Sequence, residues 1–296
     1  MNNTMQKHET KGLFFGIMAY SLWGLLPVFW KQLDSVNALE ILAHRISWSF
    51  VMLLLLNIFS GKKSILLTVL KNKKKLLTTI LAGFFISANW GIYIWAMVSE
   101  KIVESGIGYY LNPIMTVALG GLVLKEKLDK GVYLSILIAA IGLFIMTISY
   151  GHIPWVSFLL ALSFAMYGLV KKLADVDAIV SLLIETAFLL PFALAFLLYI
   201  RLKGNYAFGS SGLYITTMLM LTGLATSIPM LLFSEGVKRL KLSIMGFLQY
   251  ISPSIQIILG LLVYKESMDR IGAIAFAFTI AAVIVFTLTR SYNKNP

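Results

Sequence analysis

Ten apolar stretches, each about as long as a helix that crosses a lipid bilayer, follow one another along the chain. Lipid offers irregular backbone no hydrogen-bond partner, so stretches of this length are predicted to be helices. The sequence therefore predicts an all-α integral membrane protein with ten transmembrane helices. The predicted spans are Gly12–Leu33, Ala38–Phe59, Leu76–Val98, Glu104–Leu124, Gly131–Ser149, Ile153–Val170, Ile179–Ile200, Leu213–Glu235, Leu242–Tyr264 and Ile271–Thr289.

The composition excludes an ordinary soluble enzyme. Of the 296 residues 59% are hydrophobic and 13% are charged, whereas soluble domains carry about 25% charged residues. The chain has no cysteine, and its three histidines, His8, His44 and His152, lie far apart. We therefore expect no metal site. No phosphate-binding loop or hydrolase motif occurs, so we expect neither a cofactor nor an enzymatic activity.

The distribution of basic residues predicts the orientation in the membrane. If the N-terminus lies in the cytoplasm, most of the 25 Lys and Arg residues fall in cytoplasmic segments. Such an excess favours a cytoplasmic location for both termini. The net charge of +12 is thus explained by orientation, and we expect no nucleic-acid partner.

The second half of the chain repeats the first at an offset of 140 residues. Tyr110-Leu111-Asn112-Pro113 aligns with Tyr250-Ile251-Ser252-Pro253, and Lys125-Glu126 aligns with Lys265-Glu266. Each repeat holds five predicted helices, and an odd number inverts the second copy in the membrane. We therefore predict two inverted repeats, which are typical of transporters. They cover residues 12–149 and 153–289, between cytoplasmic tails at 1–11 and 290–296.

Several motifs resemble those of the RarD branch of the EamA family, within the drug/metabolite transporter superfamily. They include Asn89-Trp90-Gly91-Ile92-Tyr93, Gly108-Tyr109-Tyr110-Leu111-Asn112-Pro113 and Gly246-Phe247-Leu248-Gln249-Tyr250-Ile251-Ser252-Pro253. The resemblance extends over nearly the whole chain. It implies ten helices, cytoplasmic termini and a central cavity formed by both halves. One departure is Ser105-Gly106-Ile107, where the family pattern leads us to expect Ser-Leu-Gly.

Arg45 and Glu185 are ionisable residues inside predicted spans, and they are separated by the repeat period. Such residues usually face a bundle interior and have a partner. They could bind a zwitterionic substrate or titrate during a transport cycle. Alternatively, they form a structural ion pair or extend toward opposite membrane interfaces. Each lies only about 10 Å from the start of its span, so we do not expect the two to contact each other.

A set of aromatic and amide side chains could line a cavity for a small amphipathic molecule. The alternative for each is interhelical packing or hydrogen bonding. Pro113 and Pro253 occupy matching positions in the repeats and are predicted to kink their helices and serve as hinges. The candidate substrate-binding residues, with the two charged ones, are Tyr20, Trp23, Arg45, Asn89, Tyr93, Tyr109, Asn112, Tyr167, Glu185, Gln249 and Tyr250.

These features favour a secondary transporter that works by alternating access and exports small organic metabolites or amphipathic drugs such as amphenicols. The alternative is a non-transporting membrane sensor, assembly partner or lipid-handling protein. The expected partners are a small-molecule substrate and the lipid bilayer. A coupled proton or other ion is left open, as is the oligomeric state. The expected location is the bacterial cytoplasmic membrane.

Overall fold

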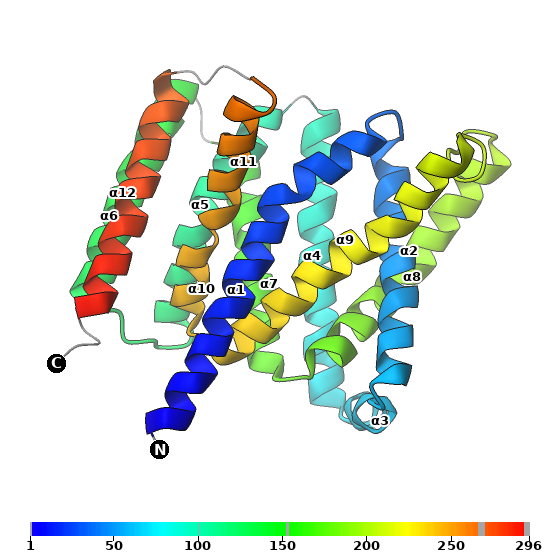
Figure 1. The fold of residues 1–296 in the computed structure, drawn as a ribbon, viewed down its shortest axis with the longest axis horizontal. Coiled ribbons are helices and arrows are strands. Elements are labelled where there is room, and N and C mark those ends of the chain that lie inside the picture. Colours follow the sequence, from blue (N-terminus) through cyan, green and yellow to red (C-terminus); the bar gives the residue numbers. More distant parts are fainter. Residues whose placement is uncertain (1, 100, 152–153, 266–269, 293–296) are drawn as a thin grey trace. The chain divides into compact units, whose positions relative to one another are not determined.

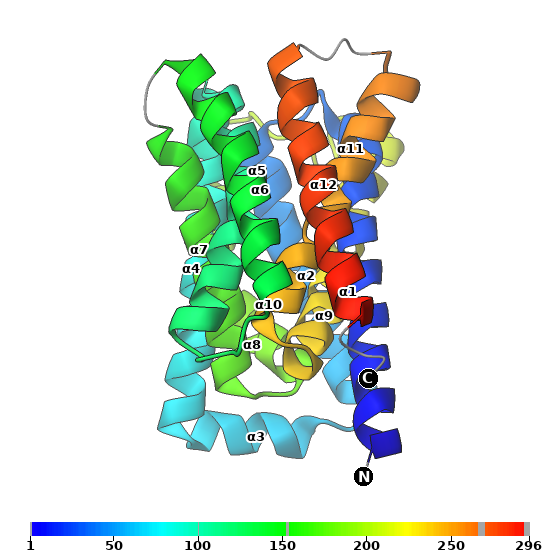
Figure 2. The same cartoon turned by 90° about the vertical axis from the view of Figure 1, so that its left-hand side faces the viewer.

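A computed structural model describes residues 2–99, 101–151, 154–265 and 270–292. Within these ranges the chain is helical and contains no strand (Figures 1 and 2). The elements are α1 (Asn2–Trp30), the 3-10 helix η1 (Lys31–Leu33), α2 (Ala38–Phe59), α3 (Lys63–Lys71), α4 (Lys73–Val98), α5 (Ile102–Leu122), α6 (Lys130–Tyr150), α7 (Trp155–Ala174), α8 (Ala178–Leu202), α9 (Gly212–Arg239), α10 (Leu242–Leu248), α11 (Ile251–Leu262) and α12 (Arg270–Tyr292).

Nine helical stretches within the described residues are long and apolar enough to cross a membrane. One of the nine, Leu242–Leu262, comprises α10 and α11 together. The remaining predicted span corresponds to α5, which has 21 residues but is not among these nine. The structure thus confirms an all-helical protein with many membrane-spanning helices.

Most helix ends differ from the predicted ones by a few residues, and three differences are larger. The connector predicted at 60–75 contains a short helix, α3. The ninth predicted span is interrupted between α10 and α11. The N-terminal tail expected at 1–11 is helical from Asn2 onward as part of α1. Residue 153, Glu266 and residues 293–296 of the expected C-terminal tail lie outside the described residues.

The chain forms two compact units, and each takes segments from both halves of the sequence. Unit 1 consists of Met1–Ser87 and Val170–Arg239, and unit 2 consists of Ala88–Leu169 and Leu240–Pro296. The boundaries between the units fall within α4, within α7 and between α9 and α10. The units therefore do not coincide with the two sequence repeats.

In unit 1, α2 packs against both α8 and α9, and α1 packs against α9. A glycine, Gly223, permits close contact between α9 and α2. A Cβ atom added to Gly223 of α9 would lie 2.5 Å from the backbone carbonyl carbon of Trp48 in α2, so any larger residue would force the helices apart. Close backbone approach at small residues is a common way for helices to associate in lipid, where water provides no driving force.

In unit 2, α5 packs against α6 and α10, and α6 pairs with α12. The loop between α5 and α6 supplies a cap for α10. The Glu126 carboxylate accepts hydrogen bonds from the backbone N–H groups of Leu242 (2.6 Å) and Ser243 (3.0 Å), and from the Ser243 hydroxyl. These bonds satisfy donors at the start of α10 that have no partner within the helix.

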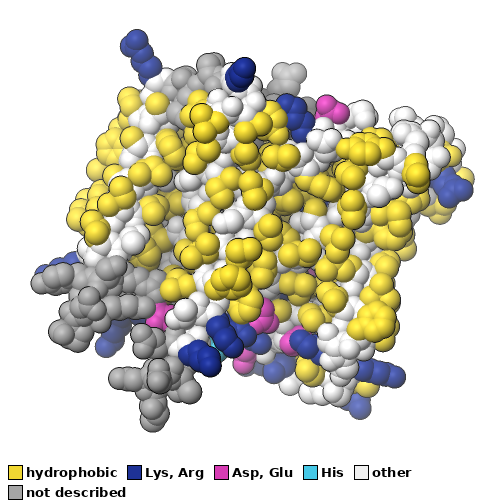
Figure 3. Space-filling view, in the orientation of Figure 1, with side chains coloured by type: hydrophobic (Ala, Val, Ile, Leu, Met, Phe, Trp, Pro, Cys, Tyr) yellow, Lys and Arg dark blue, Asp and Glu magenta, His cyan; other side chains and the backbone are white. Residues whose placement is uncertain are grey.

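The molecular surface matches a lipid environment. Figure 3 shows hydrophobic side chains covering the flanks of the helices, while Lys and Arg side chains gather near the helix ends. Large apolar residues such as Phe59, Leu202 and Leu213 are at least three-quarters exposed. Exposed apolar surface on this scale is costly in water and is expected for a protein surrounded by lipid.

The turn between α7 and α8 is held by Asp177, which lies outside the spans. Its carboxylate caps α8 by accepting from the N–H groups of Ile179 (3.0 Å) and Val180 (3.3 Å), and it accepts from Lys62 Nζ at 2.7 Å. Burial alone would raise the pKa of Asp177. The hydrogen bond and charge of Lys62, together with the two backbone donors, outweigh burial and lower the pKa below its ordinary value.

This lowered pKa predicts an acid-dependent loss of stability. A carboxyl group with a lowered folded-state pKa stabilises the protein above its unfolded pKa of about 3.9, and the effect is lost as pH falls through the folded value. We expect Asp177→Asn, which can still cap the helix, to reduce the drop in unfolding temperature below about pH 4. Scanning fluorimetry in detergent measures this. Asp175→Asn, at an exposed residue of the same turn, is the control, and equal pH profiles for both variants would contradict the assignment.

Candidate functional site

A buried ion pair connects α7 and α8 within unit 1. Lys171 Nζ donates to Glu185 Oε1 at 2.6 Å and to Ser181 Oγ at 3.0 Å. The Ser181 hydroxyl donates to the same carboxylate oxygen at 2.7 Å. Lys171 is 5% exposed and Glu185 is 1% exposed. The pair therefore lies in a low-dielectric environment, where each charge depends on the other and on the hydroxyl group between them.

The short turn after α7 brings these residues together. α7 ends at Ala174 and α8 begins at Ala178, so the two helices form a hairpin in which the last turn of one faces the first turns of the other. Ser181 and Glu185 are four residues apart and therefore share a face of α8. Gly83 of α4 lies against this face, because a Cβ atom added to it would be 3.3 Å from Glu185 Cα.

Arg45, the other charged candidate, faces α9 in the same unit. Its Nε donates to Thr226 Oγ1 at 3.0 Å, and its guanidinium lies 4.9 Å from the ring centroid of Trp30. The structure pairs Glu185 with Lys171, which the sequence analysis did not single out. A signal for this pairing is present in the sequence, because Lys171 directly follows the predicted span Ile153–Val170 and Glu185 lies near the start of the next predicted span.

Two other candidates of unit 1 form an aromatic cluster. Tyr20 and Trp23 of α1 have ring centroids 5.4 Å apart, and Phe233 of α9 lies 6.2 Å and 5.6 Å from them, respectively. Tyr20 is 2% exposed. The cluster is part of the packing of α1 on α9.

In unit 2, a chain of hydrogen bonds joins two amide candidates. Gln249 Nε2 donates to Thr116 Oγ1 (3.0 Å), and the Thr116 hydroxyl donates to the backbone carbonyl of Asn112 (2.9 Å). Because the threonine proton is used in the second bond, the amide nitrogen of Gln249 must be the donor in the first. Among the described residues, the buried Gln249 Oε1 and Asn112 Oδ1 atoms have no donor. Each can therefore accept a hydrogen bond from water or a ligand.

The break between α10 and α11 lies beside this chain of hydrogen bonds. α10 ends at Leu248 and α11 begins at Ile251. Pro253 is the third residue of α11, where a missing N–H costs no helical hydrogen bond. Pro113 lies inside α5, which is continuous from Ile102 to Leu122. A break between helices thus lies a few residues before Pro253, while α5 continues through Pro113.

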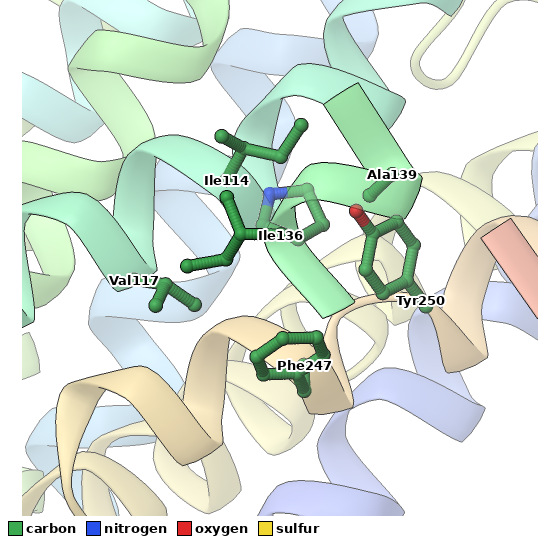
Figure 4. A pocket seen from close by; sticks show the side chains of 7 residues that line it. Ile114, Val117, Ile136, Ala139, Phe247 and Tyr250 are labelled. Atoms are coloured by element: carbon green, nitrogen blue, oxygen red, sulfur yellow. The ribbon is translucent and has the colours of Figure 1, made fainter. Parts of the chain in front are cut away.

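A small apolar pocket lies between α5, α6 and the end of α10 (Figure 4). The space between its lining side chains is too small to admit a water molecule, whereas sites for drug-sized ligands usually occupy about 300–1,000 Å³. In this conformation the lining residues are packed together and leave no room for a ligand. The lining residues are Pro113, Ile114, Val117, Ile136, Ala139, Phe247 and Tyr250.

The remaining candidates of unit 2 have different environments. Asn89 Nδ2 donates to the Leu160 carbonyl (2.8 Å) and to Ser163 Oγ (3.0 Å), and so bonds α4 to α7. Tyr167 is fully buried, and its ring centroid lies 6.1 Å from that of Phe164. Tyr93 and Tyr109 are 37% and 40% exposed. The interhelical bonding expected of amides in lipid is thus present at Asn89.

The helices define a multi-pass membrane protein, and comparison with known proteins identifies its family. The EamA-like transporter family matches residues 10–148 and 153–288 of the chain. The chain therefore belongs to the EamA-like transporter family. Together with the nine apolar helical stretches among its described residues and its bacterial relatives, this makes it a multi-pass protein of the bacterial inner membrane.

Its relatives include proteins named RarD. The chain is 41% identical to the "Uncharacterized transporter YojE" of Bacillus subtilis, with 97% of each chain covered. It is 32% identical to the "Protein RarD" of Escherichia coli, again over 97% of each chain. A solved crystal structure with 17% sequence identity has a TM-score of 0.73 and covers 95% of this chain and 98% of its own, and it supports the fold.

The buried pair predicts strong coupling between Lys171 and Glu185. Lys171→Met and Glu185→Gln should each lower the free energy of unfolding by about 3–5 kcal/mol, because each leaves a buried charge without its partner. The double variant should recover much of this loss. A double-mutant cycle in detergent measures the coupling, with Arg45→Gln and Glu185→Gln as the comparison cycle. A coupling below about 0.5 kcal/mol for Lys171 and Glu185, as expected of independent sites, would contradict the assignment.

Proposed function

We propose that this protein is a secondary transporter that exports small organic metabolites or amphipathic drugs, and that it is not an enzyme. The observation that carries the proposal is the match to a transporter family over nearly the whole chain. Relatives that are also matched over nearly their whole length are named transporters. One relative from Pseudomonas aeruginosa, 26% identical over 87% of each chain, is named "Chloramphenicol-sensitive protein RarD". This name makes amphenicols the first substrates to test.

The proposed mechanism is alternating access by ten helices arranged as two inverted repeats, with both termini in the cytoplasm. Local geometry supports the repeat. Lys125 and Lys265, at matching positions after α5 and α11, both have positive φ angles, of 53° and 55°. Such values are uncommon for residues other than glycine. Gly83 and Gly223, also 140 residues apart, each lie against the backbone of a helix from the other repeat.

Two groups of polar residues are proposed to bind ligands. Gln249 Oε1 and Asn112 Oδ1 would accept hydrogen bonds from donor groups of the substrate, with the aromatic candidates of unit 2 contacting its apolar part. The Lys171–Glu185 pair would carry a coupled ion, because protonation of Glu185 would remove the charge that holds Lys171. Ionisable residues inside membrane spans commonly mark such relays.

The inverted topology can be tested directly because the chain has no cysteine of its own. Lys125→Cys and Lys265→Cys place one thiol each at exposed positions. We expect a membrane-impermeant maleimide, added outside intact cells, to label the residue at 265 but not that at 125. Labelling of 125 after the membrane is opened is the control. Equal labelling of both thiols from outside would exclude the inverted arrangement.

Transport itself is tested by counterflow in proteoliposomes. Chloramphenicol and a panel of amines, amino acids and sugars serve as solutes. We expect saturable exchange of at least one of them, and Gln249→Ala should reduce it by about tenfold if one substrate hydrogen bond of about 1.4 kcal/mol is lost. Asn205→Ala, at an exposed loop residue, is the matched control. No exchange across the panel would argue against transport, and wild-type exchange in Gln249→Ala would remove Gln249 from the site.

A further inference from the structure

The short helix α3 has a geometry that differs from that of the spans. Figure 2 shows it lying across the ends of the neighbouring helices of unit 1. With nine residues it is about 14 Å long, which is too short to cross a bilayer. It is attached to unit 1 through Val69, which packs with Val176, Val180 and Ile184 of the α7–α8 hairpin in a buried cluster.

The apolar side of α3 is wider than the part that packs on the protein. Val69 is 3% exposed, whereas Ile65, Leu67 and Leu70 are 41%, 46% and 45% exposed. Ile65 and Leu70 flank the packed stripe formed by Leu66 and Val69, whereas Leu67 lies on nearly the opposite side of the helix. An amphipathic helix with apolar residues beyond its protein contact is suited to lie in the membrane interface, with those residues among the acyl chains.

The polar residues around α3 carry an uncompensated positive charge. Residues 60–75 contain six lysines and no acidic residue. Lys62 forms an ion pair with Asp177 at 2.7 Å, which leaves the other five without an acidic neighbour in this segment. All five are exposed. They are Lys63, Lys71, Lys73, Lys74 and Lys75.

The geometry points to a binding site for anionic phospholipid headgroups on α3 and the first turn of α4. The five exposed lysines would contact the phosphates, and Ile65, Leu67 and Leu70 would contact the acyl chains. Clusters of basic residues beside a membrane helix attract anionic lipids by about 1 kcal/mol for each residue. A free phosphate ion shares the headgroup chemistry but gains nothing from the apolar residues.

The site is connected to the ion pair through the same hairpin. Lys62 precedes α3 and binds Asp177, which caps α8, while Ile184 of the buried cluster directly precedes Glu185. Lipid bound at α3 should therefore stabilise the α7–α8 hairpin. Stabilisation follows from mass action if the lipid binds the folded state alone.

Lipid retention by the purified full-length protein tests this inference. Native mass spectrometry in detergent compares phosphatidylglycerol with phosphatidylcholine. The test variant is Lys73→Gln/Lys74→Gln/Lys75→Gln. The matched control, Lys125→Gln/Lys127→Gln/Lys130→Gln, removes the same charge from exposed positions of unit 2. We expect the first variant to lose at least about tenfold in phosphatidylglycerol retention, and the control to change by less than twofold.

Further ligands and variants distinguish binding of an anionic lipid from binding of a free anion. Phosphatidylglycerol should raise the unfolding temperature of the wild type, while phosphatidylcholine and inorganic phosphate should not. Arginine replacements at Lys73, Lys74 and Lys75 should preserve retention, and Leu67→Ser/Leu70→Ser, at exposed residues, should weaken it. Equal losses in the two glutamine variants, or equal retention of the two lipids by the wild type, would overturn the inference. An equal response to inorganic phosphate would reduce the site to an anion site.

Discussion

Lipid provides no hydrogen-bond partner, and this constraint determines how every polar group inside the spans of this protein must be arranged. The Lys171–Glu185 pair shows how a full charge is accommodated. Its two charges lie 2.6 Å apart, and Ser181 bonds to both. A buried ion pair often adds little to the stability of the folded protein, because replacing both charged residues by apolar ones is often neutral or stabilising. Ionisable residues inside membrane spans commonly mark ion pathways, and for this reason the pair is assigned a coupled ion in the proposed mechanism.

Some of the neutral polar groups, in contrast, have buried atoms without a hydrogen-bond partner among the described residues. Gln249, Thr116 and the Asn112 carbonyl form a directed chain of donors and acceptors. These hydrogen bonds leave two buried amide oxygens, Gln249 Oε1 and Asn112 Oδ1, without a donor among the described residues. A protein optimised only for stability would not keep such acceptors open. Their position beside the break between α10 and α11 agrees with the general finding that transporter sites form at interrupted helices.

Close helix packing depends on a few glycines. Gly83 and Gly223 bring α4 against α8 and α9 against α2 in unit 1, and Gly246 brings α10 against Val117 and the Pro113 carbonyl in unit 2. These contacts place the backbone of one helix beside the polar residues of another. Pro253 occupies the first turn of a helix that begins after the break, whereas Pro113 lies inside the continuous helix α5.

The sequence alone determined the class of the protein, because the length and apolarity of a span are local properties that the bilayer imposes. The predicted second span, Ala38–Phe59, has the same bounds as α2, and the motifs identified the family that comparison confirmed. Only the tertiary structure decided which side chains contact one another. Lys171 lies one residue beyond a predicted span, and its contact with Glu185 depends on how the α7–α8 turn folds. The position of α3 depends likewise on packing against that hairpin. Pairing between helices is set by which faces meet, and no local pattern in the sequence records this.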